Sequence, residues 1–124
     1  MQTQEIKRGQ IYLVNLPQTN NSIQGGGIRP VVIVSNSMAC KYSPVLHVVP
    51  ITSRIKRWMP THVEITMSSG LIKTSTALVE QIQLLPKDAI IKCVGRCNDY
   101  ILGRIDRAIG IQFGLVEACN KEVM

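Results

Sequence analysis

Short runs of alternating and β-branched apolar residues dominate the first three quarters of the chain, and turn-forming residues separate them. Such runs predict β-strands, because successive side chains of a strand point to opposite faces of a sheet. Six runs fit this description: QIYLVNL (10–16), RPVVIVSN (29–36), VLHVVPIT (45–52), THVEI (61–65), TALVEQIQLL (76–85) and IIKCVG (90–95). Strands of this length and spacing predict a small barrel or a highly curved sheet.

One of these runs contains a proline. Pro50 lies near the end of VLHVVPIT. Proline has no backbone N–H to donate to a ladder, so the run favours an edge strand or a bulge over a central strand.

The hydrophobic period changes from two to about 3.6 in NDYILGRIDRAIGIQFG (98–114). The residues at helical spacing form one mostly apolar face, namely Ile101, Leu102, Ile105, Ala108, Ile109 and Gln112. Asn98 or Asp99 can cap the start of this helix, and Gly114 can end it. The pattern predicts a helix that packs on the sheet or helps to build a dimer. The chain is therefore predicted to be mainly β with a C-terminal helix, in a single domain over 1–124.

Composition narrows the class of protein. The chain is 45% hydrophobic and 18% charged, which is typical of a globular protein. No apolar run approaches the roughly 20 residues of a membrane span, and MQTQEIKRG has no apolar core for a signal peptide. We therefore expect a cytoplasmic protein that does not associate with membranes.

The charge balance favours a polyanionic partner. Fourteen Lys and Arg against eight Asp and Glu give a net charge of +6, which favours nucleic acid first. The chain has only one Trp, three Tyr and one Phe, so extensive stacking on many bases is not expected.

The four cysteines do not form a metal motif. Cys40, Cys93, Cys97 and Cys119 have no CxxC spacing, and CVGRC would need two further ligands to hold zinc. Reduced thiols are the expected state in a cytosolic compartment. We predict no metal and no cofactor.

The first candidate for chemistry is QGGGIRP, at 24–30, which precedes the second predicted strand. The three glycines fit either a tolerant hairpin turn or a loop that lets a ligand approach the backbone. Pro30 biases Arg29 toward an extended backbone, and a planar guanidinium suits bidentate recognition of a phosphate. A solvated surface arginine is the alternative.

The second candidate is PITSRIKRW, at 50–58, where two hydroxyls and three basic residues follow the end of a strand. The residues concerned are Thr52, Ser53, Arg54, Lys56 and Arg57. Hydroxyl and basic side chains make phosphate and sugar contacts, and Trp58 could stack on a base. The alternative is a solvated basic loop with Trp58 as a hydrophobic lid.

The third candidate is LVEQI, which places Glu80 and Gln81 inside an apolar run. A carboxylate there needs a partner, so Glu80 either forms a structural ion pair, with Arg29 for example, or takes a proton from a ribose hydroxyl. His47 and His62 are also candidates for acid–base chemistry, although each lies in a strand-like run without an evident companion.

These pieces occur in a recognisable order. IKRGQIYLVNL, GGIRPVVIVSN, VVPITS, PTHVEI, ALVEQI and GRIDRAIGIQFGL together resemble the MazF/PemK family of toxins over roughly residues 6 to 115. The resemblance implies a small SH3-like β-barrel of the MazF/PemK/CcdB-like type that forms a homodimer. It also implies a metal-independent endoribonuclease that cuts single-stranded mRNA at short sequences. The products would be a 2′,3′-cyclic phosphate and a 5′-hydroxyl, and a cognate antitoxin would neutralise the toxin by laying an acidic tail across the RNA groove.

The resemblance also assigns residues. The arginine of the G-x-R-P motif is Arg29, the hydroxyl of the I-T-[ST] motif is Thr52, and the acidic residue of the E/D-Q pair is Glu80. These three are the predicted catalytic residues, with Arg29 and Thr52 stabilising charge on the phosphoryl group and Glu80 as the general base. The predicted substrate-binding residues are Gln24, Gly26, Gly27, Asn36, Ser53, Arg54, Lys56, Arg57 and Gln81.

One position departs from the family pattern. Many relatives carry a glutamate five residues before the motif arginine, where this chain has Gln24. An amide cannot act as a general base at neutral pH. Either Glu80 or a histidine takes the proton instead, or the reaction relies mostly on Arg29 and Thr52.

Two other functions fit the same pattern. The first is a non-enzymatic toxin of the same fold that poisons a protein target such as a topoisomerase, which would need an exposed apolar patch but neither Arg29 nor Thr52. The second is an SH3-like module that binds RNA without cutting it, for which the basic loop at 54–57 would suffice.

Overall fold

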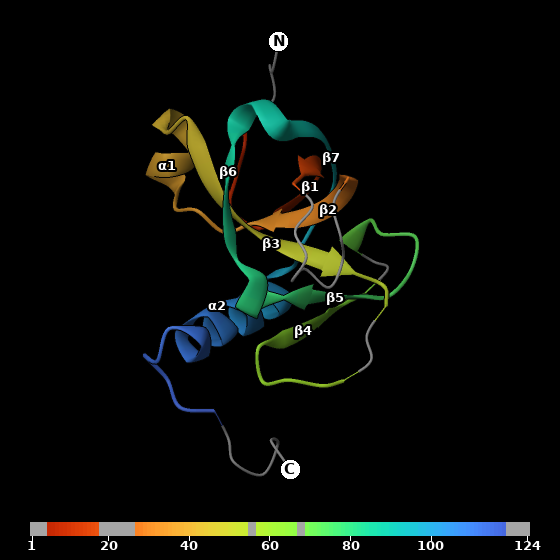
Figure 1. The fold of residues 1–124 in the computed structure, drawn as a ribbon, viewed down its shortest axis with the longest axis vertical. Helices are drawn as coiled ribbons and strands as arrows, with labels where there is room; N and C mark the ends of the chain where they lie inside the picture. The colour runs from red at the N-terminus through yellow and green to blue at the C-terminus, as the bar shows by residue number, and fades with distance from the viewer. Residues whose placement is uncertain (1–4, 18–26, 55–56, 67–68, 119–124) are drawn as a thin grey trace.

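The computed structural model describes residues 5–17, 27–54, 57–66 and 69–118. These residues form an antiparallel β fold with a helix toward the C-terminus (Figure 1). The strands are β1 (Gln10–Leu16), β2 (Gly27–Ile33), β3 (Val45–Thr52), β4 (His62–Ile65), β5 (Ser75–Leu78), β6 (Gln83–Pro86) and β7 (Ile90–Arg96). The helices are α1 (Ser37–Tyr42) and α2 (Asp99–Gln112), with single 3₁₀ turns at η2 (Val79–Gln81) and η3 (Lys87–Ala89). The predicted mainly β fold with a C-terminal helix is confirmed.

The sheet has the strand order β4-β5-β3-β2-β1-β7, and β6 also pairs with β3. Strand β3 is therefore central, so of the two alternatives for VLHVVPIT, an edge strand or a bulge, the edge strand is wrong. Pro50 lies opposite Val31 of β2. On the other side of β3, residues 45–48 pair with β6 and residues 51–52 pair with β5. Pro50 lies in the interruption between these two segments, where a missing N–H is tolerated.

The run TALVEQIQLL is not one strand. Strand β5 ends at Leu78, the turn η2 follows, and β6 begins at Gln83. The N–H of Ile82 donates to the carbonyl of Val79 (3.1 Å) and closes this turn. Leu78 and Val79 are both fully buried, so the sequence stays apolar across the turn. The turn nevertheless separates β5, which pairs with residues 51–52 of β3, from β6, which pairs with residues 45–48.

Alternation along the strands sends side chains into two apolar clusters. One cluster contains Ile11 of β1 and Val32 of β2, and it is covered by α2. The other contains Tyr12 of β1 and Val31 of β2, together with residues of β3, β6 and α1. The sheet is buried on both faces over its central strands because consecutive residues point in opposite directions.

Helix α2 packs against β4 and η2, in the lower half of the molecule in Figure 1. Asn98 caps it, since Asn98 Oδ1 accepts a hydrogen bond from the N–H of Ile101 (2.8 Å). It ends before Gly114, whose φ of 77° is in the left-handed region that favours glycine. Both predicted ends are confirmed, and five of the six residues of the predicted face are buried or packed against the core. Gln112 is the exception, because it is exposed in the last turn.

No helix within the described ranges is long and apolar enough to cross a bilayer.

Candidate active site

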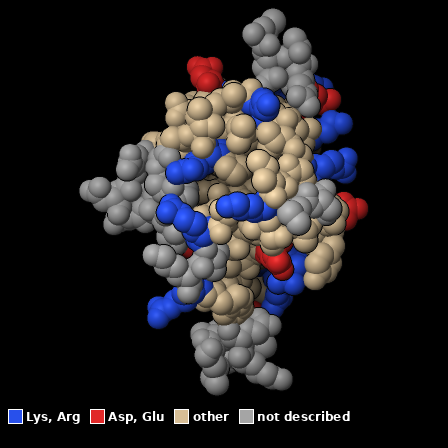
Figure 2. Space-filling view, turned by 90° about the vertical axis from the view of Figure 1, so that its right-hand side faces the viewer, with Lys and Arg blue, Asp and Glu red and all other residues tan. Residues whose placement is uncertain are grey.

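A pocket of about 430 Å³ opens beside the ends of β2 and β3. Its apolar wall comes from neighbouring strands and contains Leu13, Pro30, Ile51 and Val94. Among the described residues that line it, the polar side chains carry hydroxyls or positive charges, namely Arg29, Thr52, Ser53, Arg54, Lys73 and Ser75. Figure 2 shows Lys and Arg side chains gathered across the middle of one face of the molecule. A concave, partly apolar site surrounded by cations suits a polyanion with flat apolar groups.

Arg29 reaches the pocket from β2, where it pairs with Val14 of β1. Its side chain is exposed, and the ring of the following Pro30 forms part of the pocket wall. The strand begins at Gly27, whose φ is 91°, a conformation that other residues rarely adopt. Arg29, the predicted root of the glycine loop, is therefore held within β2, two residues after a glycine in the left-handed region.

Thr52 is the last residue of β3 and is only 8% exposed. Its Oγ1 accepts a hydrogen bond from the backbone N–H of Arg54 (3.1 Å). The hydroxyl therefore accepts locally, and its own O–H can still donate to a ligand. This turn also orients Ser53 and Arg54, which line the same pocket.

The far wall of the pocket is the segment 70–75, which sequence reasoning missed. The φ of Gly70 is 102°, and a Cβ atom placed on it would lie 2.3 Å from the carbonyl oxygen of Val94. A Cβ on Gly95 would lie 1.8 Å from the carbonyl oxygen of Ser69. The two backbones thus touch, and this contact brings Lys73 to the pocket. The only signal in the sequence is a pair of glycines 25 positions apart, which does not by itself predict a contact.

The structure places Glu80 away from this pocket. Glu80 lies in η2, where its carboxylate accepts a hydrogen bond from Thr61 Oγ1 (2.8 Å) and lies 3.0 Å from His62 Nε2. Its side chain is 17% exposed. Of the alternatives for Glu80, the structure shows an ion pair, but its partner is His62 rather than Arg29, because the turn at 79–81 points this carboxylate toward β4. Gln81 is half-buried in the same turn and does not line the pocket.

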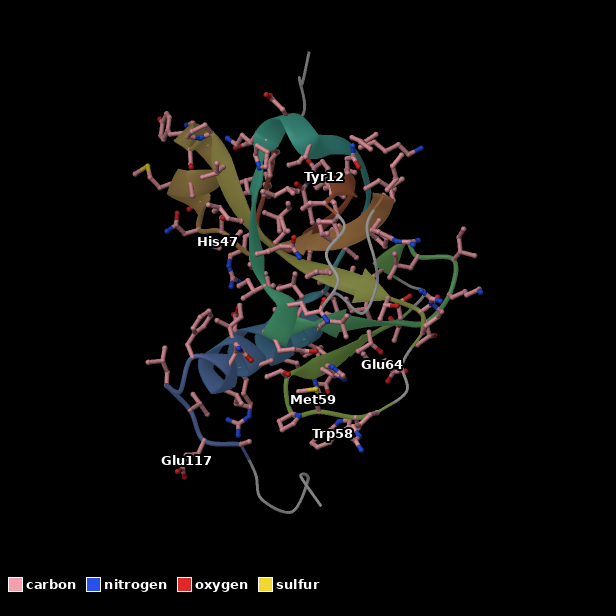
Figure 3. All side chains as sticks on the ribbon, in the orientation of Figure 1. Tyr12, His47, Trp58, Met59, Glu64 and Glu117 are labelled. Carbon is pink, nitrogen blue, oxygen red and sulfur yellow. The ribbon has the colours of Figure 1, made fainter. Side chains whose placement is uncertain are left out.

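Other predicted residues lie elsewhere. Asn36 does not line the pocket, since it caps α1 by accepting a hydrogen bond from the N–H of Ala39 (2.8 Å). Arg57 is exposed and does not line the pocket. Gly27 lies on β2, two residues before Arg29, and does not line the pocket either. His47, labelled in Figure 3, is exposed on β3 and does not line the pocket. Gln24, Gly26 and Lys56 lie outside the described residues.

The cysteines of the described part of the chain are free thiols at positions 40, 93 and 97. Burial raises the pKa of the Cys97 thiol to about 11 and also raises that of Cys40. Such thiols are poor nucleophiles because the thiolate is the reactive form. Within the described residues, no three His, Cys, Asp or Glu side chains lie close enough together to hold a metal ion.

The sequence matches, over residues 7–113, the family described as "PemK-like, MazF-like toxin of type II toxin-antitoxin system". The chain belongs to this family. It is also 43% identical over 112 residues to endoribonuclease MazF of Staphylococcus saprophyticus, a match that covers 89% of this chain and 92% of the relative. The MazF/PemK resemblance is therefore confirmed, and the chain is a homologue of an endoribonuclease.

Solved structures give the same result for the fold of this MazF-like chain. An endoribonuclease in complex with its cognate antitoxin, from a mycobacterial species, has a TM-score of 0.75 and 26% identity, covering 90% of this chain and 97% of that one. MazF from Deinococcus radiodurans has a TM-score of 0.76 over 90% of this chain and 98% of its own, at 19% identity. The fold of this chain is thus MazF-like.

Proposed function

We propose that this MazF-like protein is a toxin that cuts single-stranded RNA, chiefly mRNA, at short sequences and without a metal ion. The observation that carries the proposal is the meeting of Arg29 and Thr52 in one basic pocket, in a chain that belongs to a toxin family with endoribonuclease members. A cognate antitoxin neutralises it, the active form is a homodimer, and it acts in the cytoplasm, where mRNA lies.

The proposed reaction is attack of a ribose 2′-oxygen on the neighbouring phosphorus. A bond forms between O2′ and phosphorus while the bond from phosphorus to the 5′-oxygen of the next nucleotide breaks. The products are a 2′,3′-cyclic phosphate and a 5′-hydroxyl. The 2′-hydroxyl loses its proton to water, and the leaving oxygen gains one, so that protons and charge balance.

The residues of the pocket act mainly through electrostatics. Arg29 stabilises the negative charge that grows on the phosphoryl oxygens, and Thr52 donates its hydroxyl hydrogen to the same oxygens. Arg54 and Lys73 hold flanking phosphates, so affinity for RNA falls as salt rises. Among the described residues that line the pocket there is no carboxylate and no imidazole. Of the alternatives for the proton, we therefore propose that the reaction relies mostly on Arg29 and Thr52.

The test is incubation of the purified protein with a long single-stranded RNA in EDTA, followed by mapping of both ends of each fragment. We expect discrete cuts with cyclic-phosphate ends. Arg29→Ala and Thr52→Val are each expected to slow cutting by about 10²–10³-fold, the usual loss for one stabilising donor. Arg96→Ala is the matched control, because Arg96 is exposed on β7 and does not line the pocket.

Intact RNA with the wild-type protein and with Gln24→Glu would reject the ribonuclease. Cutting by Gln24→Glu alone would instead identify Gln24 as the cause of a weakened enzyme. Toxicity that survives in Arg29→Ala would favour a toxin that poisons a protein target. RNA that is bound but never cut would favour a plain RNA-binding module.

A further inference from the structure

A second pocket lies on another part of the molecule, between the segment that leads into β4 and helix α2. Its volume is about 340 Å³, and none of its lining residues belongs to the first pocket. Two aromatic rings and two guanidinium groups line it, from Trp58, Tyr100, Arg104 and Arg107. The reaction proposed above uses none of these residues.

The basic side of this pocket is a stripe along α2. Tyr100, Arg104 and Arg107 recur at helical spacing and are exposed. Arg104 Nη1 donates a hydrogen bond to the hydroxyl of Tyr100 (3.2 Å), and its guanidinium lies 5.9 Å from the centre of that ring. This contact holds one cation at the mouth of the pocket, with a second cation one turn further along the helix.

The opposite side is formed by Trp58 and His62. Trp58 is 49% exposed, and Figure 3 places it with Met59 at the lower edge of the molecule, beside β4. A half-exposed indole at a pocket edge offers a flat apolar face to a ligand. Stacking of a nucleobase on such a ring is a common and sequence-tolerant source of binding energy.

His62 adds a buried acceptor to the wall. Its side chain is 5% exposed, and its Nε2 lies 3.0 Å from the Glu80 carboxylate. Because an ionised carboxylate only accepts, Nε2 carries the hydrogen, and in the neutral ring Nδ1 is an acceptor. Among the residues that the structure describes, Nδ1 has no hydrogen-bond partner. A buried acceptor without a donor is costly, so the wall favours a ligand that brings an N–H or O–H group.

We propose that this pocket binds one nucleotide of single-stranded RNA, with the base against Trp58 and a phosphate on Arg104 and Arg107. An amino group or ribose hydroxyl of the nucleotide donates to His62 Nδ1 in the wall of the pocket. The choice of RNA rests on the proposed function. The pocket is then a specificity site that reads a base away from the cut, while Arg29 and Thr52 act on the phosphate.

Acidic peptide is the other ligand that two guanidiniums could hold. The observations favour a nucleotide, because a carboxylate offers no hydrogen to an acceptor nitrogen and no flat face to an indole. A base with its sugar and phosphate matches all three features of the pocket at once.

The experiment uses Trp58 as the probe, since it is the single Trp of the chain. Adenosine 5′-monophosphate is titrated into the full-length protein while Trp58 fluorescence is recorded. We expect saturable quenching, and binding about tenfold or more weaker for ribose 5-phosphate, which lacks the base to stack. The double variant Arg104→Gln/Arg107→Gln is expected to lose about tenfold or more in affinity. The matched control Lys41→Gln/Arg96→Gln removes the same charge elsewhere and is expected to bind as the wild type does.

Several outcomes would overturn the proposal. These are no quenching, equal quenching by ribose 5-phosphate, equal loss in the control variant, or displacement of the nucleotide by an acidic peptide at equal concentration. A fluorescence change on dilution of the protein alone, without nucleotide effects, would show instead that a second copy covers the pocket. Because this titration needs no cleavage, RNA cutting without nucleotide binding would reject the pocket alone, and nucleotide binding without cutting would reject the ribonuclease alone.

A second readout links the pocket to cutting. Fragment ends from a long RNA are compared for the wild type, Arg104→Gln/Arg107→Gln and the control variant. We expect the pocket variant to cut with cyclic-phosphate ends but with a relaxed preference at one flanking base. An unchanged preference would contradict a role in specificity.

Discussion

Cys97 shows how a single side chain ties the last strand to the core. It is 4% exposed, lies directly after β7 and belongs to the cluster covered by α2. Its backbone N–H donates to the carbonyl of Gly9 (2.8 Å). Burial raises the pKa of its thiol from its ordinary value of 9.0 to about 11, because the apolar surroundings disfavour the thiolate.

This pKa predicts a loss of stability in alkali. Between pH 9 and pH 11 the unfolded chain loses the Cys97 proton while the folded chain keeps it. The unfolded state then binds fewer protons, so the free energy of unfolding falls as pH rises through this window and is unaffected below it. The measurement is urea unfolding at steps from below pH 9 to pH 11.

Cys97→Ala is the comparison, since alanine does not titrate. Tyr12 and Cys40 also have raised pKa values and contribute to the same fall in both proteins. The free energy of unfolding of the variant should therefore fall less steeply with pH than that of the wild type. Parallel curves would show that Cys97 does not carry the effect.

At the same scale, the sequence predicted some of the residues that line the first pocket and not others. Arg29 and Thr52 could be predicted because each adjoins a strand end, where local sequence determines the position of the side chain. The position and partners of Glu80 could not be predicted, because they depend on where a 3₁₀ turn points its side chain, and the apolar run around Glu80 concealed that turn. Lys73 could not be predicted either, since it reaches the pocket through a backbone contact distant in sequence.

At the scale of elements, the loop 69–75 and strand β7 depend on each other. Gly70 and Gly95 let their backbones touch, and this contact carries the wall of the first pocket. No side chain fits between them. The position of this pocket wall therefore depends on both residues being glycine, because a Cβ atom on either one would push the two backbones apart.

Gly95→Ala is accordingly expected to destabilise the protein by about 1–3 kcal/mol, the usual range for an overpacked site. The new Cβ would meet the carbonyl of Ser69, which is backbone and cannot rotate away. Gly103→Ala is the control. Gly103 lies in α2 with nothing within 4 Å of a new Cβ, so this change is expected to stabilise by about 0.5–1 kcal/mol. Thermal or urea unfolding of the two variants would decide, and equal effects would contradict the contact.

The strands themselves could largely be predicted, because alternation is a local signal. Residues 10–16 and 45–52 match β1 and β3 at both ends. The short helix α1 was missed, since six residues are too few for a hydrophobic period to show. The break between β5 and β6 at 79–81 was missed because it arises from pairing. The two strands pair with different segments of β3, and the sequence does not show which strands pair.

At the scale of the whole molecule, we propose cutting at the first pocket and base recognition at the second. The first lies beside the ends of β2 and β3, and the second lies between β4 and α2. The sequence could predict the net charge that favours RNA, but not this division, because each pocket is assembled from segments far apart in the chain. If both proposals hold, substitutions in separate elements would change specificity and cutting independently.

Strand β3 joins three neighbours, β2, β5 and β6, and so belongs to both apolar clusters. Unfolding of β3 would therefore disrupt both apolar clusters at once. We therefore expect a single cooperative unfolding transition, with fluorescence of Trp58 and circular dichroism of the sheet changing together. The slowest amide hydrogen exchange should lie at Val48, Val49 and Ile51 and report the global free energy of unfolding. Two separated transitions would show that the halves melt independently, whereas coincident ones would mean that neither half persists as a partly folded remnant once β3 is lost.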